Sequence, residues 1–158
     1  MDAEKKQEFT RRISQSNRSG LVVIQYEILD AYLEDACIAN EQNDYEAFKE
    51  AVRKADRVLA ELSEALNFKY ELAGQLYAIY NFARRALMKC IVQKSCEGIS
   101  DAKRALAPLW DAFRQIAAQD TSEPLMRNAQ QIYAGITYGK ENLKESFQEP
   151  DTSRGFFA

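Results

Sequence analysis

Histidine is the residue type on which much side-chain catalysis depends, and the 158-residue chain contains none. This excludes Ser-His-Asp and Cys-His catalysis, histidine-ligated zinc and histidine phosphotransfer. A di-iron carboxylate centre in a helical bundle is excluded as well, because it needs Glu-x-x-His pairs. Cys37, Cys90 and Cys96 are odd in number and lack C-x-x-C spacing, so we expect buried or half-buried reduced thiols in a cytosolic protein.

Sequence motifs for nucleotide binding and metal binding are also missing. Neither a G-x-G-x-x-G loop nor a G-x-x-x-x-G-K-[ST] loop occurs, and the spacing of the carboxylates and thiols forms no metal-ligand cluster. The net charge of −3 does not provide the broad positive field of a nucleic-acid binder. We therefore expect a protein that is not an enzyme, has no cofactor or metal, and binds no nucleic acid.

Two segments bear on the cellular location of the chain. Residues 1–17 are charged and lack the apolar core of a signal peptide. The longest uncharged apolar run, residues 72–83, is far shorter than the roughly 20 residues that cross a membrane. We expect a cytoplasmic protein without membrane insertion.

Apolar residues recur at helical spacing along most of the chain. The counts of Gly 6 and Pro 3 are too low for the many turns of a β sandwich. Short polar connections separate the helical segments, which favours antiparallel neighbours. We expect an all-α fold, an antiparallel up-down-up-down four-helix bundle. Its long helices are expected at about 18–39, 43–66, 71–93 and 100–119.

Polar residues mark where these helices should begin. The expected N-caps are Asn17 or Ser19, Asn43 in a capping box with Glu46, and Ser100. Pro108 lies inside the fourth long helix. We expect it to kink that helix, because proline removes one backbone hydrogen bond and clashes with the preceding turn.

Shorter segments flank the expected bundle. Residues 1–17 form a charged arm or short helix whose narrow apolar edge consists of Phe9 and Ile13. Pro124 marks the start of an extra helix at about 123–137. We expect one domain over 1–138 with its core at about 18–119, followed by a disordered polar tail over 139–158.

The first and third long helices are apolar over a wider arc than one shared core can hide. A surface helix usually buries an arc of roughly 100° or somewhat more. On the first helix, Glu27, Asp30 and Glu34 form only one narrow polar stripe, and the third carries two apolar seams. The terminal segments could cover this surplus, copies of the chain could self-associate on it, or a groove could bind a partner's amphipathic or disordered segment. The covering side chains would be Phe9, Ile13, Leu125, Ile132 and Tyr133.

Four stretches in register carry a resemblance to a known family. The sequence LVVIQY at 21–26 begins the first long helix, and VLAELSEALN at 58–67 ends the second. The third helix contains L-x-x-IYNF-x-x-R-x-L at 76–87, and the fourth carries a matching pattern over 99–113. In order and spacing, these stretches resemble the FliS family of flagellar secretion chaperones that bind flagellin.

This resemblance implies a cytoplasmic chaperone without enzymatic activity. FliS-type proteins bind the disordered C-terminal segment of flagellin and wrap it as helices around the bundle. Binding blocks premature filament polymerisation, and the chaperone delivers the subunit to a component of the flagellar export gate. A self-associating structural bundle or adaptor without a peptide ligand is the alternative, and we expect a monomer or weak homodimer.

The matched motifs and the second seam of the third helix suggest which residues contact flagellin. The motif positions can equally be core residues, because both roles require apolar side chains at helical spacing, whereas Tyr77, Arg84 and Met88 are expected to be more exposed. The expected contacts are Leu21, Ile24, Ile28, Leu76, Tyr77, Tyr80, Arg84, Leu87 and Met88. The resemblance further implies an N-terminal arm that occupies part of the groove, here through Phe9 and Ile13.

Overall fold

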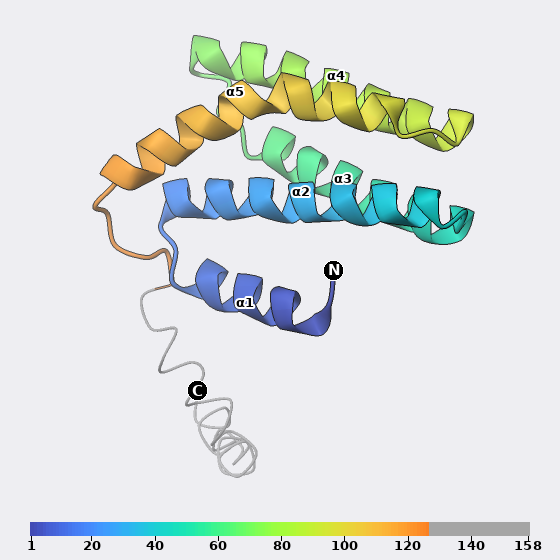
Figure 1. Ribbon diagram of the computed structural model, residues 1–158. Helices are drawn as coiled ribbons and strands as arrows, with labels where there is room; N and C mark the ends of the chain where they lie inside the picture. Colours follow the sequence, from blue (N-terminus) through green and yellow to red (C-terminus); the bar gives the residue numbers. More distant parts are fainter. Residues whose placement is uncertain (127–158) are drawn as a thin grey trace, which may run out of the picture. The chain divides into compact units, whose positions relative to one another are not determined.

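The computed structural model describes residues 1–126, and the fold of this part is helical (Figure 1). Its five helices are α1 (Ala3–Ser14), α2 (Arg18–Glu41), α3 (Tyr45–Glu64), α4 (Glu71–Gln93) and α5 (Glu97–Gln119). No strand occurs among the described residues, so the expected all-α class is confirmed.

The extra helix expected at 123–137 is the one predicted element that the structure describes only in part. Residues 123–126 are not helical. The remainder of that helix, with Ile132 and Tyr133, and the tail at 139–158 lie outside the described residues. The segment that follows α5 is instead held by hydrogen bonds to the start of α2. Ser19 Oγ donates to Asp120 Oδ2 at 2.6 Å, and the Leu125 N–H donates to the Ser16 carbonyl at 3.0 Å.

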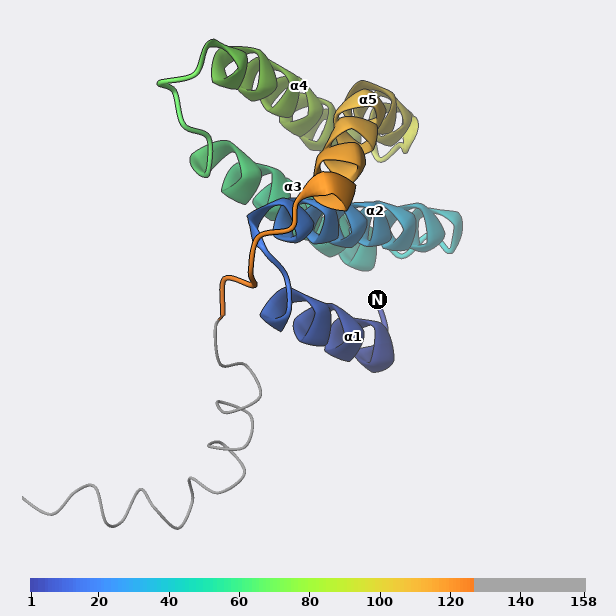
Figure 2. The ribbon, with the colours of Figure 1, turned by 90° about the vertical axis from the view of Figure 1, so that its left-hand side faces the viewer.

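The four long helices are packed in a cyclic order. α2 packs against α3 and α5, and α4 packs against the same two helices, so α2 and α4 occupy opposite corners. α1 packs against α2, and Figures 1 and 2 both place it on the side of α2 away from α4. α5 bends partway along its length in Figure 1, as expected from Pro108 inside it.

The apolar residues of α3 recur at steps of three and four and form the seam predicted for this helix. Every α3 member of that seam is buried: Phe48, Val52, Ala55, Leu59 and Leu62. The opposite side is charged, with Lys54 paired to Glu50 at 2.6 Å. α3 is therefore an ordinary amphipathic helix with one buried face.

Two tyrosines meet in the middle of the core. The hydroxyl groups of Tyr26 on α2 and Tyr80 on α4 lie 2.9 Å apart and share a buried hydrogen bond across the bundle. Burial raises the pKa of both phenols above the ordinary tyrosine value. Each hydroxyl thus satisfies the other in an interior that otherwise consists mainly of apolar side chains.

We expect either single substitution, Tyr26→Phe or Tyr80→Phe, to lower the free energy of unfolding by about 1–3 kcal/mol, because it leaves one buried hydroxyl unpaired. The double variant should lose less than the sum of the single losses, as measured by urea denaturation. The raised pKa values keep the pair's contribution intact below pH 10. Above about pH 10, where unfolded tyrosines ionise, the wild type should lose stability relative to the double variant. Additive losses would contradict the pairing.

The N-cap predictions have different outcomes. Asn17 is the N-cap of α2, as expected, and its side chain accepts a hydrogen bond from the Gly20 N–H at 2.9 Å. The capping box at Asn43 is wrong. Asn43 adopts a left-handed conformation with φ of 57°, which moves the cap to Asp44, and Glu46 pairs with Lys49 instead.

The expected cap at Ser100 is also wrong. α5 begins at Glu97, three residues earlier, and the Glu97 N–H donates to Ser95 Oγ at 3.3 Å. Gly98 lies in this added first turn and packs directly on α4. A Cβ built at Gly98 would lie 2.4 Å from the Ala86 carbonyl oxygen and 2.7 Å from Cys90 Sγ. The helix can start early because glycine permits this close approach.

Candidate functional site

Part of the second seam predicted on α4 lies at the surface: its members Tyr77 and Met88 are exposed, whereas Ala73 and Tyr80 are buried. Tyr77, Asn81, Arg84 and Met88 follow one another at steps of four, three and four, so they line one side of the helix. Tyr77 and Met88 are exposed, while Asn81 and Arg84 are half-buried. We call these four residues the α4 stripe. The described part of the chain leaves this portion of the apolar surplus uncovered.

Arg84 joins the α4 stripe to α3. Its Nε donates to Asp56 Oδ1 at 2.7 Å and its Nη2 donates to Asp56 Oδ2 at 3.0 Å. This two-pronged bond fixes the guanidinium group and raises the pKa of Arg84. A surface hollow of about 370 Å³ surrounds the ion pair and is lined by Asp56, Asn81, Arg84, Arg85 and Met88. The stripe therefore combines apolar side chains with one fixed charged pair.

The connection between α3 and α4 adds apolar surface that the sequence analysis treated only as a turn. Phe68 and Tyr70 in this connection, and Leu72 in the first turn of α4, are each more than 60% exposed. Phe68 packs edge-on against Tyr77 with ring centroids 5.6 Å apart, so this connection continues the α4 stripe. The sequence offered one signal for this surface: two aromatic residues, Phe68 and Tyr70, lie in a short connection close to Tyr77.

Three of the predicted contacts lie in the interior. Tyr80 and Leu87 belong to the main core, and Ile24 is buried outside it. These positions take the core role that the periodicity left open, and in this structure they offer almost no surface to a partner. The other predicted contacts on these helices, Leu21, Ile28 and Leu76, are half-buried. Since α2 and α4 lie at opposite corners, the structure does not bring the two predicted groups into one face.

The N-terminal arm is an ordered helix on α2. Phe9 is buried at 7% exposure and Ile13 is half-buried. Ile24 and Ala31, seven residues apart on one side of α2, are likewise buried outside the main core. α1 therefore covers part of the apolar surplus of α2, and Phe9 is the most buried apolar side chain of α1.

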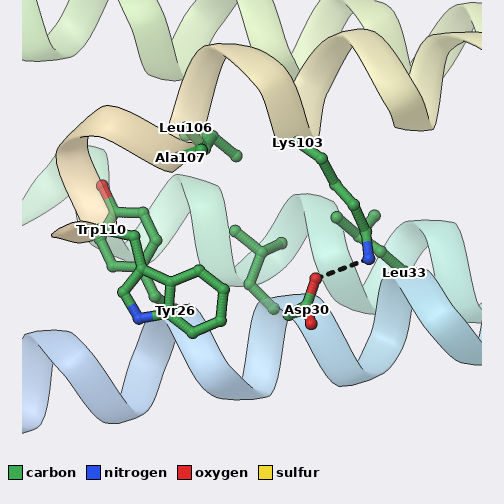
Figure 3. Close-up of a pocket in the computed structure, with 8 residues that line it drawn as sticks. Tyr26, Asp30, Leu33, Lys103, Leu106, Ala107 and Trp110 are labelled. Carbon is green, nitrogen blue, oxygen red and sulfur yellow. Dashed lines mark ion pairs between the residues drawn. The ribbon is translucent and has the colours of Figure 1, made fainter.

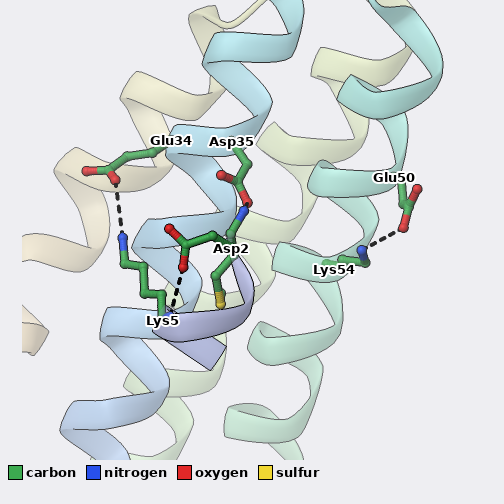
Figure 4. Close-up of polar contacts among 7 residues, drawn as sticks. Asp2, Lys5, Glu34, Asp35, Glu50 and Lys54 are labelled. Atoms are coloured by element: carbon green, nitrogen blue, oxygen red, sulfur yellow. Dashed lines mark hydrogen bonds and ion pairs between the residues drawn. The ribbon is translucent and has the colours of Figure 1, made fainter. Parts of the chain in front are cut away.

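Ion pairs link both ends of the N-terminal arm to α2. Arg12 Nη2 donates to Glu27 Oε1 at 3.0 Å, and this contact raises the pKa of Arg12. Lys5 Nζ lies 4.0 Å from Glu34 Oε2, and the amino group of Met1 pairs with Asp35 (Figure 4). Glu27 and Glu34 of the acidic stripe are therefore matched by basic side chains of α1, whereas Asp30 of the same stripe pairs with Lys103 of α5.

We expect Phe9→Ala to detach α1 from α2, because exposed ion pairs contribute only about 0–1 kcal/mol each whereas burial of a phenylalanine contributes about 1.5–3 kcal/mol. Hydrogen exchange of the α1 backbone amides should become faster in this variant. Lys5→Ala, which removes the long ion pair alone, is the control and should change the exchange little. Equal effects of both substitutions would show that charge rather than Phe9 holds the arm.

The described residues hold no cluster of three or more histidine, cysteine or acidic side chains suited to a metal ion. Within the same part of the chain, no helix is long and apolar enough to span a membrane. The three cysteines are free thiols, and burial raises the pKa of Cys90 and Cys96. The surface of α4 presents apolar and aromatic side chains beside the Arg84–Asp56 ion pair, which are groups suited to non-covalent binding.

Comparison with known protein families identifies one family that matches most of the chain. The family described as flagellar protein FliS matches residues 1–120, which contain all five helices. No curated protein sequence matches the chain. FliS proteins are helical flagellar chaperones rather than enzymes, and the family match implies export of flagellin. The chain belongs to the FliS family.

Proposed function

We propose that this protein is a cytoplasmic export chaperone that binds the disordered C-terminal segment of flagellin. Binding prevents premature polymerisation of the filament, and the loaded chaperone hands flagellin to a component of the flagellar export gate. The α4 stripe and the neighbouring α3–α4 connection form the contact surface. The half-buried contacts on α2 would join after α1 moves aside.

One observation carries this proposal: a family of flagellin chaperones matches a chain that exposes Tyr77 and Met88 on one side of α4. Tyr77 is 44% exposed and Phe68 is 62% exposed, although they pack on each other. Phenylalanine, tyrosine and methionine suit a peptide-binding surface, because they offer large contact areas and methionine adapts to varied partners. An amphipathic segment that folds as a helix on this surface fits the helix-in-groove mode of recognition.

The energetics allow such a ligand to fold on binding. Ordering a disordered segment costs about 2–5 kcal/mol of the gross interaction energy. Each large apolar side chain that becomes buried contributes about 1.5–3 kcal/mol. A few contacts with Phe68, Tyr77 and Met88 therefore offset the ordering cost and leave a net affinity. The fixed Arg84–Asp56 pair would orient the segment rather than supply most of this energy.

The proposal is tested by titrating the full chain with the C-terminal segment of a flagellin. We expect one-to-one binding by calorimetry with a negative heat-capacity change, because apolar surface is buried. Circular dichroism should show more helix in the mixture than in the sum of the separate components. The control is the N-terminal segment of the same flagellin, which should not bind. If the C-terminal segment neither binds nor gains helix, the proposed function is wrong.

The long helices are proposed to form the up-down-up-down antiparallel bundle, which their cyclic packing order supports. The free protein is proposed to be a monomer or weak homodimer. The alternative is a structural bundle that buries the α4 stripe against a second copy and leaves no peptide site. Size-exclusion chromatography with light scattering separates the two, since only the alternative requires a stable dimer that flagellin does not dissociate.

A further inference from the structure

Basic side chains without an ion-pair partner gather beside the α4 stripe. Arg53 and Arg57 on α3, and Arg85 and Lys89 on α4, are exposed. None of the four forms an ion pair within residues 1–126. We call these four residues the basic flanks. The whole chain carries a net charge of −3, so the basic flanks are opposite in sign to the chain that contains them.

The charge of the basic flanks is not cancelled by a direct contact in the described part of the chain. Elsewhere a basic side chain that faces a neighbouring helix finds a carboxylate there. Lys103 pairs with Asp30 at 2.6 Å beside the cavity between α2 and α5 that Trp110 also lines (Figure 3). On α3, the carboxylate nearest the α4 stripe is that of Asp56, and Arg84 already occupies both of its oxygens.

The basic flanks lie on both sides of the Met88 end of the α4 stripe. Arg85 lines the surface hollow together with Met88, and Lys89 follows Arg85 by four residues, about 40° around α4. The colours of Figure 1 show that α3 and α4 run in opposite directions. Arg53 precedes Asp56 by three residues, so it lies on the Met88 side of the ion pair that joins α3 to the stripe.

The other end of the stripe is less positive. Glu64 lies about two turns beyond Asp56 on α3, in the direction of Tyr77. The bond to Asp56 and, to a smaller extent, the charge of Glu64 raise the pKa of Arg84, so Glu64 is close enough to act on this surface. The α4 stripe therefore has a positive end at Met88 and apolar side chains at both ends.

We propose that the α4 stripe and its basic flanks bind an amphipathic segment whose carboxylates lie beside its apolar residues at the end that covers Met88. The carboxylates would contact Arg85, Lys89 and Arg53, and the apolar residues would cover Met88 and Tyr77. Arginine suits this role because its fork of donors matches a carboxylate. That the segment belongs to an export substrate rests on the proposed function, to which this inference adds a charge pattern.

Two designed peptides of about 18 residues, or five helical turns, test the charge pattern. They share one apolar face of leucine residues and carry either glutamate or lysine on both sides of that face. With the full chain at low salt, fluorescence anisotropy should show at least about tenfold tighter binding of the glutamate peptide. Added salt should reduce this difference, because it screens exposed charges. Equal affinities would overturn the proposal.

Arg85→Glu tests the location. The new carboxylate repels the glutamate peptide and can also pair with Lys89 one turn later. We expect the glutamate peptide to lose at least about fivefold in affinity and the lysine peptide to gain affinity, a gain that a misfolded variant could not produce. Arg11→Glu is the matched control, because Arg11 is an exposed arginine of α1, which lies away from α4. It should change either affinity less than about twofold, and equal effects of the two substitutions would contradict the assignment.

Two polyanions without an apolar face distinguish the proposed ligand from a plain anion. Polyglutamate and a single-stranded oligothymidylate should each bind at least about tenfold more weakly than the glutamate peptide, because neither covers Met88 and Tyr77 with aliphatic side chains. Equally tight binding of either polyanion would overturn the proposal in favour of a charge patch. A dimer that Arg85→Glu dissociates, without binding of either peptide, would instead assign this face to a second copy of the chain.

The result can be separated from that of the flagellin titration. If the flagellin segment binds but the two peptides bind equally, the proposed function stands and the charge pattern is wrong. If the glutamate peptide is preferred and Arg85→Glu reverses the preference, the surface is a site for acidic amphipathic segments, even when flagellin does not bind and the proposed function fails.

Discussion

Replacing Tyr77 with aspartate is expected to weaken binding of the flagellin C-terminal segment by about 2–4 kcal/mol, or roughly 30- to 1,000-fold in Kd. Tyr77 lies where the α4 stripe meets Phe68, so its loss removes the aromatic contact that links helix and connection. The new carboxylate would also have to leave water when the partner binds. Isothermal titration calorimetry measures the change directly.

Phe82→Asp is the matched control for this variant. Phe82 lies on the same helix and is 45% exposed, against 44% for Tyr77. Five residues separate the two, which places Phe82 about 140° around the helix from Tyr77. We expect the control to bind flagellin with nearly wild-type affinity. If both variants lose affinity equally, the partner covers α4 on both sides and the stripe is not the defined contact.

The second large effect concerns stability. Gly98→Ala should lower the free energy of unfolding by about 1–3 kcal/mol, although alanine favours a helix over glycine by up to about 1 kcal/mol. The clash decides the sign, because the new Cβ would meet a backbone carbonyl of α4 at 2.4 Å. Backbone atoms cannot yield as a flexible side chain does, so α5 would have to move away from α4. Chemical denaturation monitored by circular dichroism provides the measurement.

Gly74→Ala on α4 is the control, because a Cβ at Gly74 meets nothing within 4 Å. There the helix propensity acts alone, and we expect a gain of about 0.5–1 kcal/mol in the free energy of unfolding. The two substitutions are chemically identical, so opposite signs isolate the close approach of α5 to α4. Stabilisation by both would show that the first turn of α5 is free to shift.

The local sequence pattern predicted most of the secondary structure. α4 was expected at about 71–93 and lies at Glu71–Gln93, because polar connections bound a long apolar-periodic segment. Errors occurred at helix starts, where several capping residues compete within a few positions. Asn43 and Ser100 are both plausible caps by residue type. The left-handed turn at Asn43 moves the cap of α3 by one residue to Asp44, and the packing of Gly98 on α4 accompanies a cap of α5 at Cys96, four residues before Ser100.

The candidate site was predicted only in part. Helical spacing identifies which side chains share a face, and it placed Tyr77, Arg84 and Met88 together correctly. Spacing does not say which of two apolar faces turns inward. The packing of α4 against α3 and α5 buries Tyr80 and Leu87, for which a core role was an equal alternative, and leaves Tyr77, which was expected to be more exposed, at the surface.

By itself the sequence determined the helical class, the absence of histidine chemistry and the excess of apolar surface on two helices, because these follow from composition and periodicity along one chain. The tertiary structure decided how that excess is divided. α1 buries Phe9 against α2, the seam of Tyr77 and Met88 stays exposed, and the cavity at Trp110 opens between helices that are distant in sequence. Each outcome depends on contacts between segments many residues apart, and helical periodicity carries no information about such contacts.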